Sequence, residues 1–77
     1  MALAFLLLNV KPGHEDEVLK ELASIPEVRE ARRVFGVYDA VVKVEADSME
    51  KLKEVVNRRV KRLYNVTSIT SLIVVSS

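Results

Sequence analysis

The sequence lacks cysteine and tryptophan altogether and has one histidine among its 77 residues. Without cysteine, the chain cannot form disulfides, thiolate nucleophiles or cysteine-based zinc sites. The lone His14 cannot build a histidine-rich metal cluster within one chain, and the sequence contains no glycine-rich phosphate loop or nucleophile elbow. The sequence therefore predicts no metal site, no cofactor and no catalytic residue.

A large charge of one sign is also absent. Lysine and arginine number 12 against 11 acidic residues, which gives a formal net charge of +1. Domains that bind nucleic acid or a membrane surface usually need a stronger field of one sign. The apolar run Ala2–Leu8 is too short for a membrane span or the core of a signal peptide. We therefore expect no direct contact with nucleic acid, no membrane association and a cytoplasmic location.

The chain has enough apolar residues to fold, since 49% are hydrophobic and 30% are charged. Its length predicts a single domain over residues 1–77. A chain this short buries a modest core and has no disulfide to reinforce it. We therefore expect it to self-associate.

The hydrophobic periodicity predicts six elements in the order strand, helix, strand, strand, helix, strand. They are strands near residues 3–10, 28–35, 38–45 and 66–75, with helices over residues 15–24 and from 48 to about 63. Pro26 ends the first helix, and Asp47 is the predicted N-cap of the second, with Glu50 as its capping-box partner. The strand–helix–strand unit occurs twice, so the order βαββαβ predicts an α+β, ferredoxin-like fold. In that fold, one four-stranded antiparallel sheet carries both helices on one face.

The first expected strand is apolar on both of its faces. Leu3, Phe5 and Leu7 point to one side, and the residues between them, which point to the other side, are also apolar. Helices cover only one face of such a sheet, so the apolar residues of the other face would lie in water. We therefore expect a homodimer in which the open sheet face of one copy packs on that of the other.

The segment Gly36–Asp39, between the second and third expected strands, is the strongest candidate site. Gly36 can adopt a positive φ and allow a close approach by a ligand. Asp39 offers a carboxylate for an ammonium group, beside exposed backbone donors and acceptors. The alternative is a hairpin turn in which the aspartate stabilises its own backbone.

Other charged groups are weaker candidates. His14 is a potential metal ligand or acid–base group, or an exposed residue at a helix start. The acids at 15–17 favour the start of a helix, because consecutive helical residues do not converge on one substrate atom. The basic cluster Arg58, Arg59, Lys61 and Arg62 either contacts an anion or another subunit, or lies in solvent at a helix C-terminus.

The sequence resembles the effector-binding (RAM) domain of the Lrp/AsnC transcription regulators over essentially its whole length. The resemblance is carried by Ala4–Val10, Pro12–Gly13, Ile25–Val28, Gly36–Ala40, Val44–Ser48 and Thr70–Val74. It implies a ferredoxin-like domain that dimerises through its sheets, assembles further into octamers or decamers, and binds a free amino acid between dimers. It also implies that the effector is bound by Gly36, Val37, Tyr38, Asp39, Thr70 and Ser71, with Asp39 taking the ammonium group.

The resemblance does not include the helix-turn-helix domain of a full-length regulator. We therefore expect a stand-alone, non-catalytic, amino-acid-sensing oligomerisation module that modulates transcription through a full-length Lrp/AsnC regulator. One alternative is a pure assembly module without a ligand. Another is a small dimeric enzyme, since ferredoxin-like dimers also host catalysis.

Overall fold

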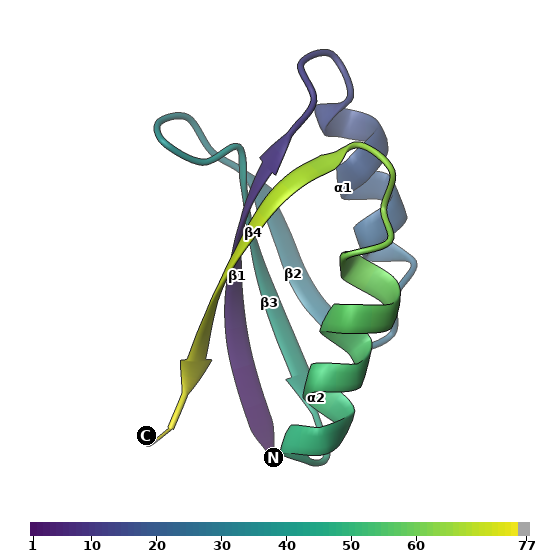
Figure 1. Cartoon of the computed structure of the whole chain (residues 1–77), viewed down its shortest axis with the longest axis vertical. Helices are drawn as coiled ribbons and strands as arrows, with labels where there is room; N and C mark the ends of the chain where they lie inside the picture. The colour runs from purple at the N-terminus through teal and green to yellow at the C-terminus, as the bar shows by residue number, and fades with distance from the viewer. Residues whose placement is uncertain (76–77) are drawn as a thin grey trace.

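The computed structural model describes residues 1–75, which form one antiparallel sheet with helices on one face (Figure 1). The elements are β1 Ala2–Val10, α1 Glu15–Ala23, β2 Val28–Arg33, β3 Ala40–Ala46, α2 Met49–Val55, the π-helical turn η1 Val56–Val60, and β4 Val66–Val74. The four strands lie in the order β2-β3-β1-β4. The predicted ferredoxin-like βαββαβ fold is confirmed.

The core lies between the helices and the sheet. Burial alternates without a break along β1 and β3, and the buried set starts at Ala2 on β1 and at Ala40 on β3. The register pairs Leu6 with Val42, so the buried positions of both strands share the helix-facing side. The helices add fully or almost fully buried side chains from one stripe each: Val18, Leu22, Leu52, Val55, Val56 and Val60.

Two predicted strand boundaries differ from the structure by two residues, and the others agree to within one. The second strand ends at Arg33 rather than 35, and the third begins at Ala40 rather than 38. Gly36 has a φ of 135°, which is incompatible with a continuous strand, and the loop that contains it joins the two strands. The regular β2–β3 ladder therefore ends before this loop.

The start of α2 also corrects the predicted cap. Ser48, in an extended conformation, is the N-cap, and its side-chain oxygen accepts a hydrogen bond from the backbone N–H of Lys51 at 3.1 Å. Asp47 lies one residue too early, and the position that a capping-box glutamate would occupy holds Lys51. Glu50 instead lies in the first turn, where its charge favours the helix dipole.

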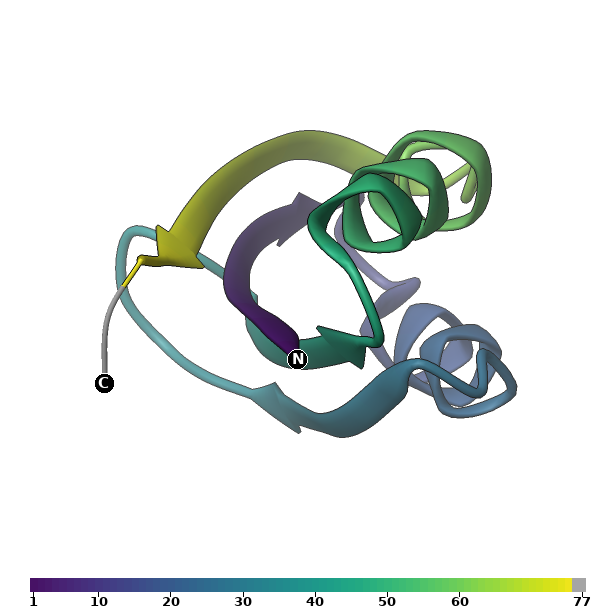
Figure 2. The same cartoon turned by 90° about the horizontal axis from the view of Figure 1, so that it is seen from below.

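The sheet is strongly curved, with its concave side toward the helices and its opposite face uncovered (Figure 2). The apolar side chains on that face come from the two central strands and β4: Leu3, Phe5, Leu7, Val41, Leu72 and Val74. Neighbouring strands bury them only in part, and Leu72 remains 52% exposed. The structure therefore confirms that the sheet has an apolar face that no helix of the described chain covers.

Candidate functional site

The loop of residues 34–39 joins β2 to β3 and projects beyond the sheet (Figure 1). The backbone N–H of Val34 donates to the carbonyl of Asp39 at 3.0 Å and closes the loop. Asp39 in turn donates its N–H to the carbonyl of Leu8 at 2.8 Å and anchors the loop to β1. Gly36 is needed for its positive φ rather than for space, because no atom lies within 4 Å of where a Cβ would stand.

The Asp39 carboxylate has a structural partner. Its Oδ2 accepts a hydrogen bond from the backbone N–H of Val10 at 2.7 Å. The β1–β3 pairing ends at Leu8 and Ala40, so this carboxylate satisfies an N–H beyond the end of the ladder. Within the described chain, Oδ1 makes no hydrogen bond. The Asp39 side chain therefore stabilises the backbone of β1 rather than that of its own turn, and its second oxygen has no partner in the described residues.

A chain of polar contacts runs from β4 across β1 to the loop. Ser68 Oγ donates to Asn9 Oδ1 at 2.6 Å, and Asn9 Nδ2 donates to the carbonyl of Val37 at 2.8 Å. The hydroxyls of Tyr38 and Thr70 lie 3.4 Å apart. Sequence reasoning missed Asn9 and Ser68, although Asn9 is the one polar residue in β1 and could have drawn attention.

Four of the six predicted effector contacts lie in the loop, and the structure places a fifth, Thr70 on the open sheet face, beside Tyr38 of that loop. Ser71 is separated from them. The register pairs Thr70 with Leu7 and Ser71 with Leu6, so Ser71 points to the helix-facing side. Adjacent residues of a strand cannot share a face, and the sequence alone did not show which of the two would face the loop.

The remaining candidates near α1 are linked to this loop only through Arg33, whose guanidinium also lies 5.6 Å from the ring centre of Phe35. His14 Nδ1 lies 2.9 Å from Glu17 Oε2, and Arg33 lies 3.8 Å from both Glu15 and Asp16. These exposed pairs belong to the surface around the start of α1. In residues 1–75, no three histidine, cysteine or acidic side chains gather into a group that could hold a metal ion.

The basic cluster at the end of the second helix divides in two. Arg58, Arg59 and Arg62 are exposed, whereas Lys61, also exposed overall, lines a groove between η1 and β4. Within the described part of the chain, none of the four forms an ion pair. No described helix is long and apolar enough to cross a membrane.

The fold and its surfaces define a class, that of a ferredoxin-like domain with an uncovered apolar sheet face and a polar loop at its edge. A sequence model of the Lrp/AsnC ligand binding domain matches residues 3–77, and the chain belongs to this family. The family predicted from the sequence is therefore confirmed.

Relatives and solved structures agree with this assignment. The chain is 44% identical over 50 residues to the HTH-type transcriptional regulator FL11 of Pyrococcus horikoshii. The matched residues make up 65% of this chain and 33% of that protein. The match thus spans about a third of the length of each of these curated relatives. The structure of FFRP-DM1 matches with a TM-score of 0.94 and 33% identity over 97% of this chain and 100% of that one. Escherichia coli AsnC matches with a TM-score of 0.91 and 26% identity over 99% of this chain and 52% of that one.

Proposed function

We propose that this chain senses a free amino acid and couples its binding to assembly. The amino acid binds at the loop Gly36–Asp39 beside Thr70, where sheet-paired dimers meet in an octamer or decamer. The assembly modulates transcription together with a full-length Lrp/AsnC regulator and performs no catalysis. The chain's membership of a ligand-binding domain family of transcription regulators supports this role.

The observation that carries the proposal is the chemistry of the loop. An amino acid presents an ammonium group and a carboxylate a few ångströms apart. Asp39 Oδ1 is suited to the ammonium. The backbone N–H groups of Gly36 and Val37, which have no partner within residues 1–75, and the Thr70 hydroxyl are suited to the carboxylate. Because Ser71 lies on the other face of its own protomer, Thr70 takes the hydroxyl role.

The surfaces beside the loop support binding between copies. The open sheet face offers an apolar interface for a dimer, and Val37 at the tip of the loop is 83% exposed. Phe35 is 92% exposed, with the Arg33 guanidinium 5.6 Å from its ring centre. A loop with apolar residues at its tip and polar groups at its base is suited to a contact with a second dimer. The regulator NMB0573 of Neisseria meningitidis, whose structure contains L-Met, shares this fold at 17% identity with a TM-score of 0.84.

Native mass spectrometry tests the proposal, since one spectrum reports subunit number and bound mass together. We expect an oligomer built from dimers that gains one amino acid per site from a pool of common amino acids. Asp39→Asn keeps an oxygen for the Val10 N–H but removes the charge, and should weaken binding about tenfold or more. Asp47→Asn, on an exposed residue before α2, is the matched control and should bind normally.

Three outcomes contradict the proposal. A stable monomer would show that the open sheet face is not a dimer interface. An oligomer that takes up no amino acid would support the alternative of a pure assembly module without a ligand. Equal binding by the Asp39→Asn variant would show that the ammonium group is bound elsewhere.

A further inference from the structure

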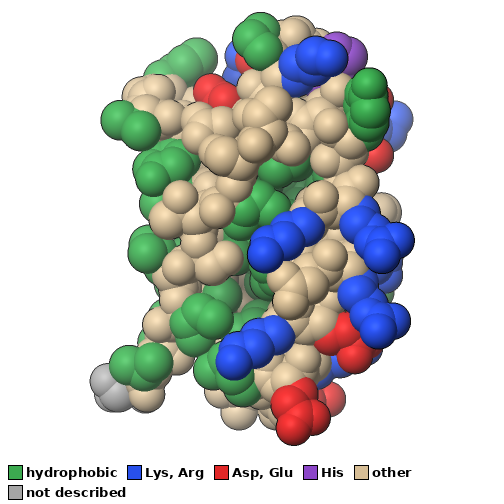
Figure 3. All heavy atoms as spheres, in the orientation of Figure 1, with side chains coloured by type: hydrophobic (Ala, Val, Ile, Leu, Met, Phe, Trp, Pro, Cys, Tyr) green, Lys and Arg blue, Asp and Glu red, His purple; other side chains and the backbone are tan. Residues whose placement is uncertain are grey.

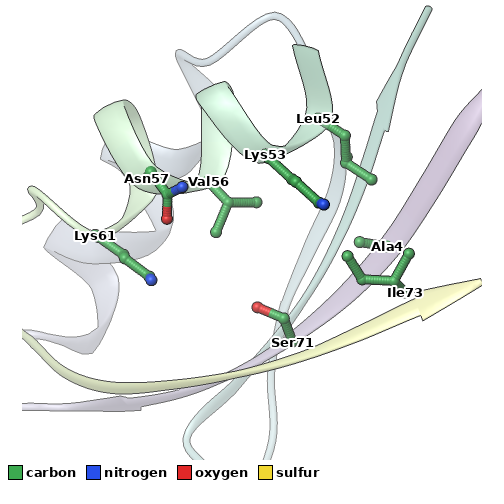
Figure 4. Close-up of a pocket in the computed structure, with 8 residues that line it drawn as sticks. All are labelled: Ala4, Leu52, Lys53, Val56, Asn57, Lys61, Ser71 and Ile73. Atoms are coloured by element: carbon green, nitrogen blue, oxygen red, sulfur yellow. The ribbon is translucent and has the colours of Figure 1, made fainter. Parts of the chain in front are cut away.

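A groove lies between the second helix and the edge strand β4, on the helix side of the sheet (Figure 4). Its cavity volume is ≈ 110 Å³. Residues from β1, α2, η1, β4 and the turn after η1 line it: Ala4, Leu52, Lys53, Val56, Asn57, Lys61, Ser71 and Ile73. In Figure 1 the C-terminal half of β4 runs away from α2, and Figure 3 shows hydrophobic side chains lying open between these two elements.

The floor of the groove is apolar. Ala4 and Leu52 are fully buried beneath it, and Val56 is 8% exposed. Ile73 of β4 forms the far wall and is 37% exposed, so part of this surface lies in water in the isolated chain. An aliphatic group placed here would bury apolar surface that the fold leaves uncovered.

The rim of the groove carries hydrogen-bond donors. Figure 4 shows the ends of Lys53 and Lys61 and the hydroxyl of Ser71 directed toward the same space. Asn57 lies between the two lysines along the helix and adds an amide. Ser71 is thus separate from the loop site and lines this groove together with the two lysines.

The π-helical turn helps to place both lysines on one groove. In a regular α-helix, a residue eight positions on lies about 80° further round the axis. The turn Val56–Val60 is wider, and the Lys61 N–H bonds to the carbonyl of Val56, five residues back, at 2.9 Å. A wider turn rotates less per residue, which brings Lys61 back toward the line of Lys53.

The groove has positive charge without an internal counter-charge. No aspartate or glutamate lines it. Within residues 1–75, neither Lys53 nor Lys61 has a carboxylate within 4 Å, whereas the neighbouring Lys51 pairs with Glu54 at 3.6 Å. The arginines at 58, 59 and 62 add to the positive potential on this side.

These features select a class of ligand. Two ammonium groups, an amide and a hydroxyl suit a carboxylate with a neighbouring carbonyl oxygen. The apolar floor favours an aliphatic chain over a bare inorganic anion, and the volume accommodates a short one. An amino acid is disfavoured, because its own ammonium group would meet two lysines and no carboxylate.

We propose that the α2–β4 groove is a second ligand site, which binds a small aliphatic carboxylate without an amine, such as a branched 2-oxo acid. The carboxylate lies between Lys53 and Lys61, with Asn57 and Ser71 on the oxo group and the aliphatic chain on Val56 and Ile73. This site is independent of the loop site, which recognises an ammonium group.

Amide chemical shifts of the intact protein test this proposal. The probe is 4-methyl-2-oxopentanoate, and leucine is its matched analogue, with the same carbon skeleton and an ammonium group in place of the oxo group. We expect the 2-oxo acid to shift the amides of residues 53–57, 61 and 71. Leucine and inorganic phosphate should leave those amides in place at the same concentration.

Charge-neutral variants assign the lysines. Lys53→Gln and Lys61→Gln should each weaken binding about tenfold, since each removes one charged donor, and the double variant should abolish it. Lys20→Gln, on the exposed surface of α1, makes the same charge change and should bind as the native protein does.

The proposal is overturned if the 2-oxo acid shifts no amide of the groove, or if Lys20→Gln weakens binding as much as the groove variants. Phosphate binding as tightly as the 2-oxo acid would show that the apolar floor contributes nothing. Leucine shifting the groove amides equally would show that the site does not discriminate against an amine. Shifts at residues 36–39 on addition of an amino acid report on the loop site and are scored separately.

Discussion

Two substitutions of Asp39 distinguish the structural role of its carboxylate from the proposed role in binding a ligand. Asp39→Ala removes the oxygen that accepts the Val10 N–H at 2.7 Å in a partly buried position. A hydrogen bond to a charged group contributes about 1.5–3 kcal/mol, and the alanine variant also leaves the Val10 N–H without its partner. Because the site is only partly buried, we expect the free energy of unfolding to fall by about 1.5 kcal/mol.

Asp39→Asn provides the comparison. Its side-chain oxygen can still accept the same N–H as a neutral group, so the loss should be only about half as large. For a chain of 77 residues, the alanine variant should lower Tm by roughly 10 °C.

Urea denaturation followed by circular dichroism measures the free energy of unfolding of the native protein and both variants. All three must be compared at one protein concentration, because self-association stabilises the folded state by mass action. The reasoning fails if the alanine and asparagine variants are equally stable. It also fails if the alanine variant unfolds like the native protein, because Val10 would then not depend on this carboxylate.

Three further predictions concern the sheet face, the loop and the helix cap. Leu7→Lys places a charge on the open sheet face and should shift the protein toward monomers in analytical ultracentrifugation, whereas Glu21→Lys on the exposed side of α1 should not. Gly36→Ala forces a side chain into a φ of 135° and should lower the free energy of unfolding by about 1–2 kcal/mol in urea denaturation. Ser48→Ala removes the cap of α2 and should cost about 1 kcal/mol in the same assay, whereas Asp47→Ala should cost clearly less.

Each of these has an outcome that contradicts it. A Leu7→Lys protein that sediments as the native one does would place the interface elsewhere. An unchanged Gly36→Ala protein would show that the loop tolerates another φ. Equal losses of stability in the Ser48→Ala and Asp47→Ala variants would show that both residues contribute to the cap.

The central part of the fold was predictable because its physical signals are local. In β3, apolar residues alternate with a set that includes Lys43 and Glu45, which separates its two faces in the sequence. The strand β1 is apolar on both faces, and its register with β3, which pairs Leu6 with Val42, shows which of its residues face the helices. The edge strand β2 gave a weaker signal, because a bulge between Val28 and Glu30 interrupts its alternation. The helix cap was misplaced by one residue because Asp47 and Ser48 are both good capping residues, and only the backbone conformation decides between them.

The candidate site was predictable in part. The glycine and aspartate of the loop are recognisable from their types and spacing. The contact between Asn9 and Ser68 joins residues 59 positions apart, and no local pattern indicates it. The π-helical turn has no hydrophobic period of its own, so the alignment of Lys53 with Lys61 required the three-dimensional structure.

The two edges of the sheet differ in a way that bears on aggregation. Four of the six residues of β2 are charged, whereas none of the nine residues of β4 is. A further strand added at β2 would have to approach these charges, and the bulge distorts the hydrogen-bonding pattern that it would need. Strand addition is therefore favourable at β4 alone. Chains that can join through one edge only close into pairs, because a filament of continuous sheet needs both edges to remain open to growth.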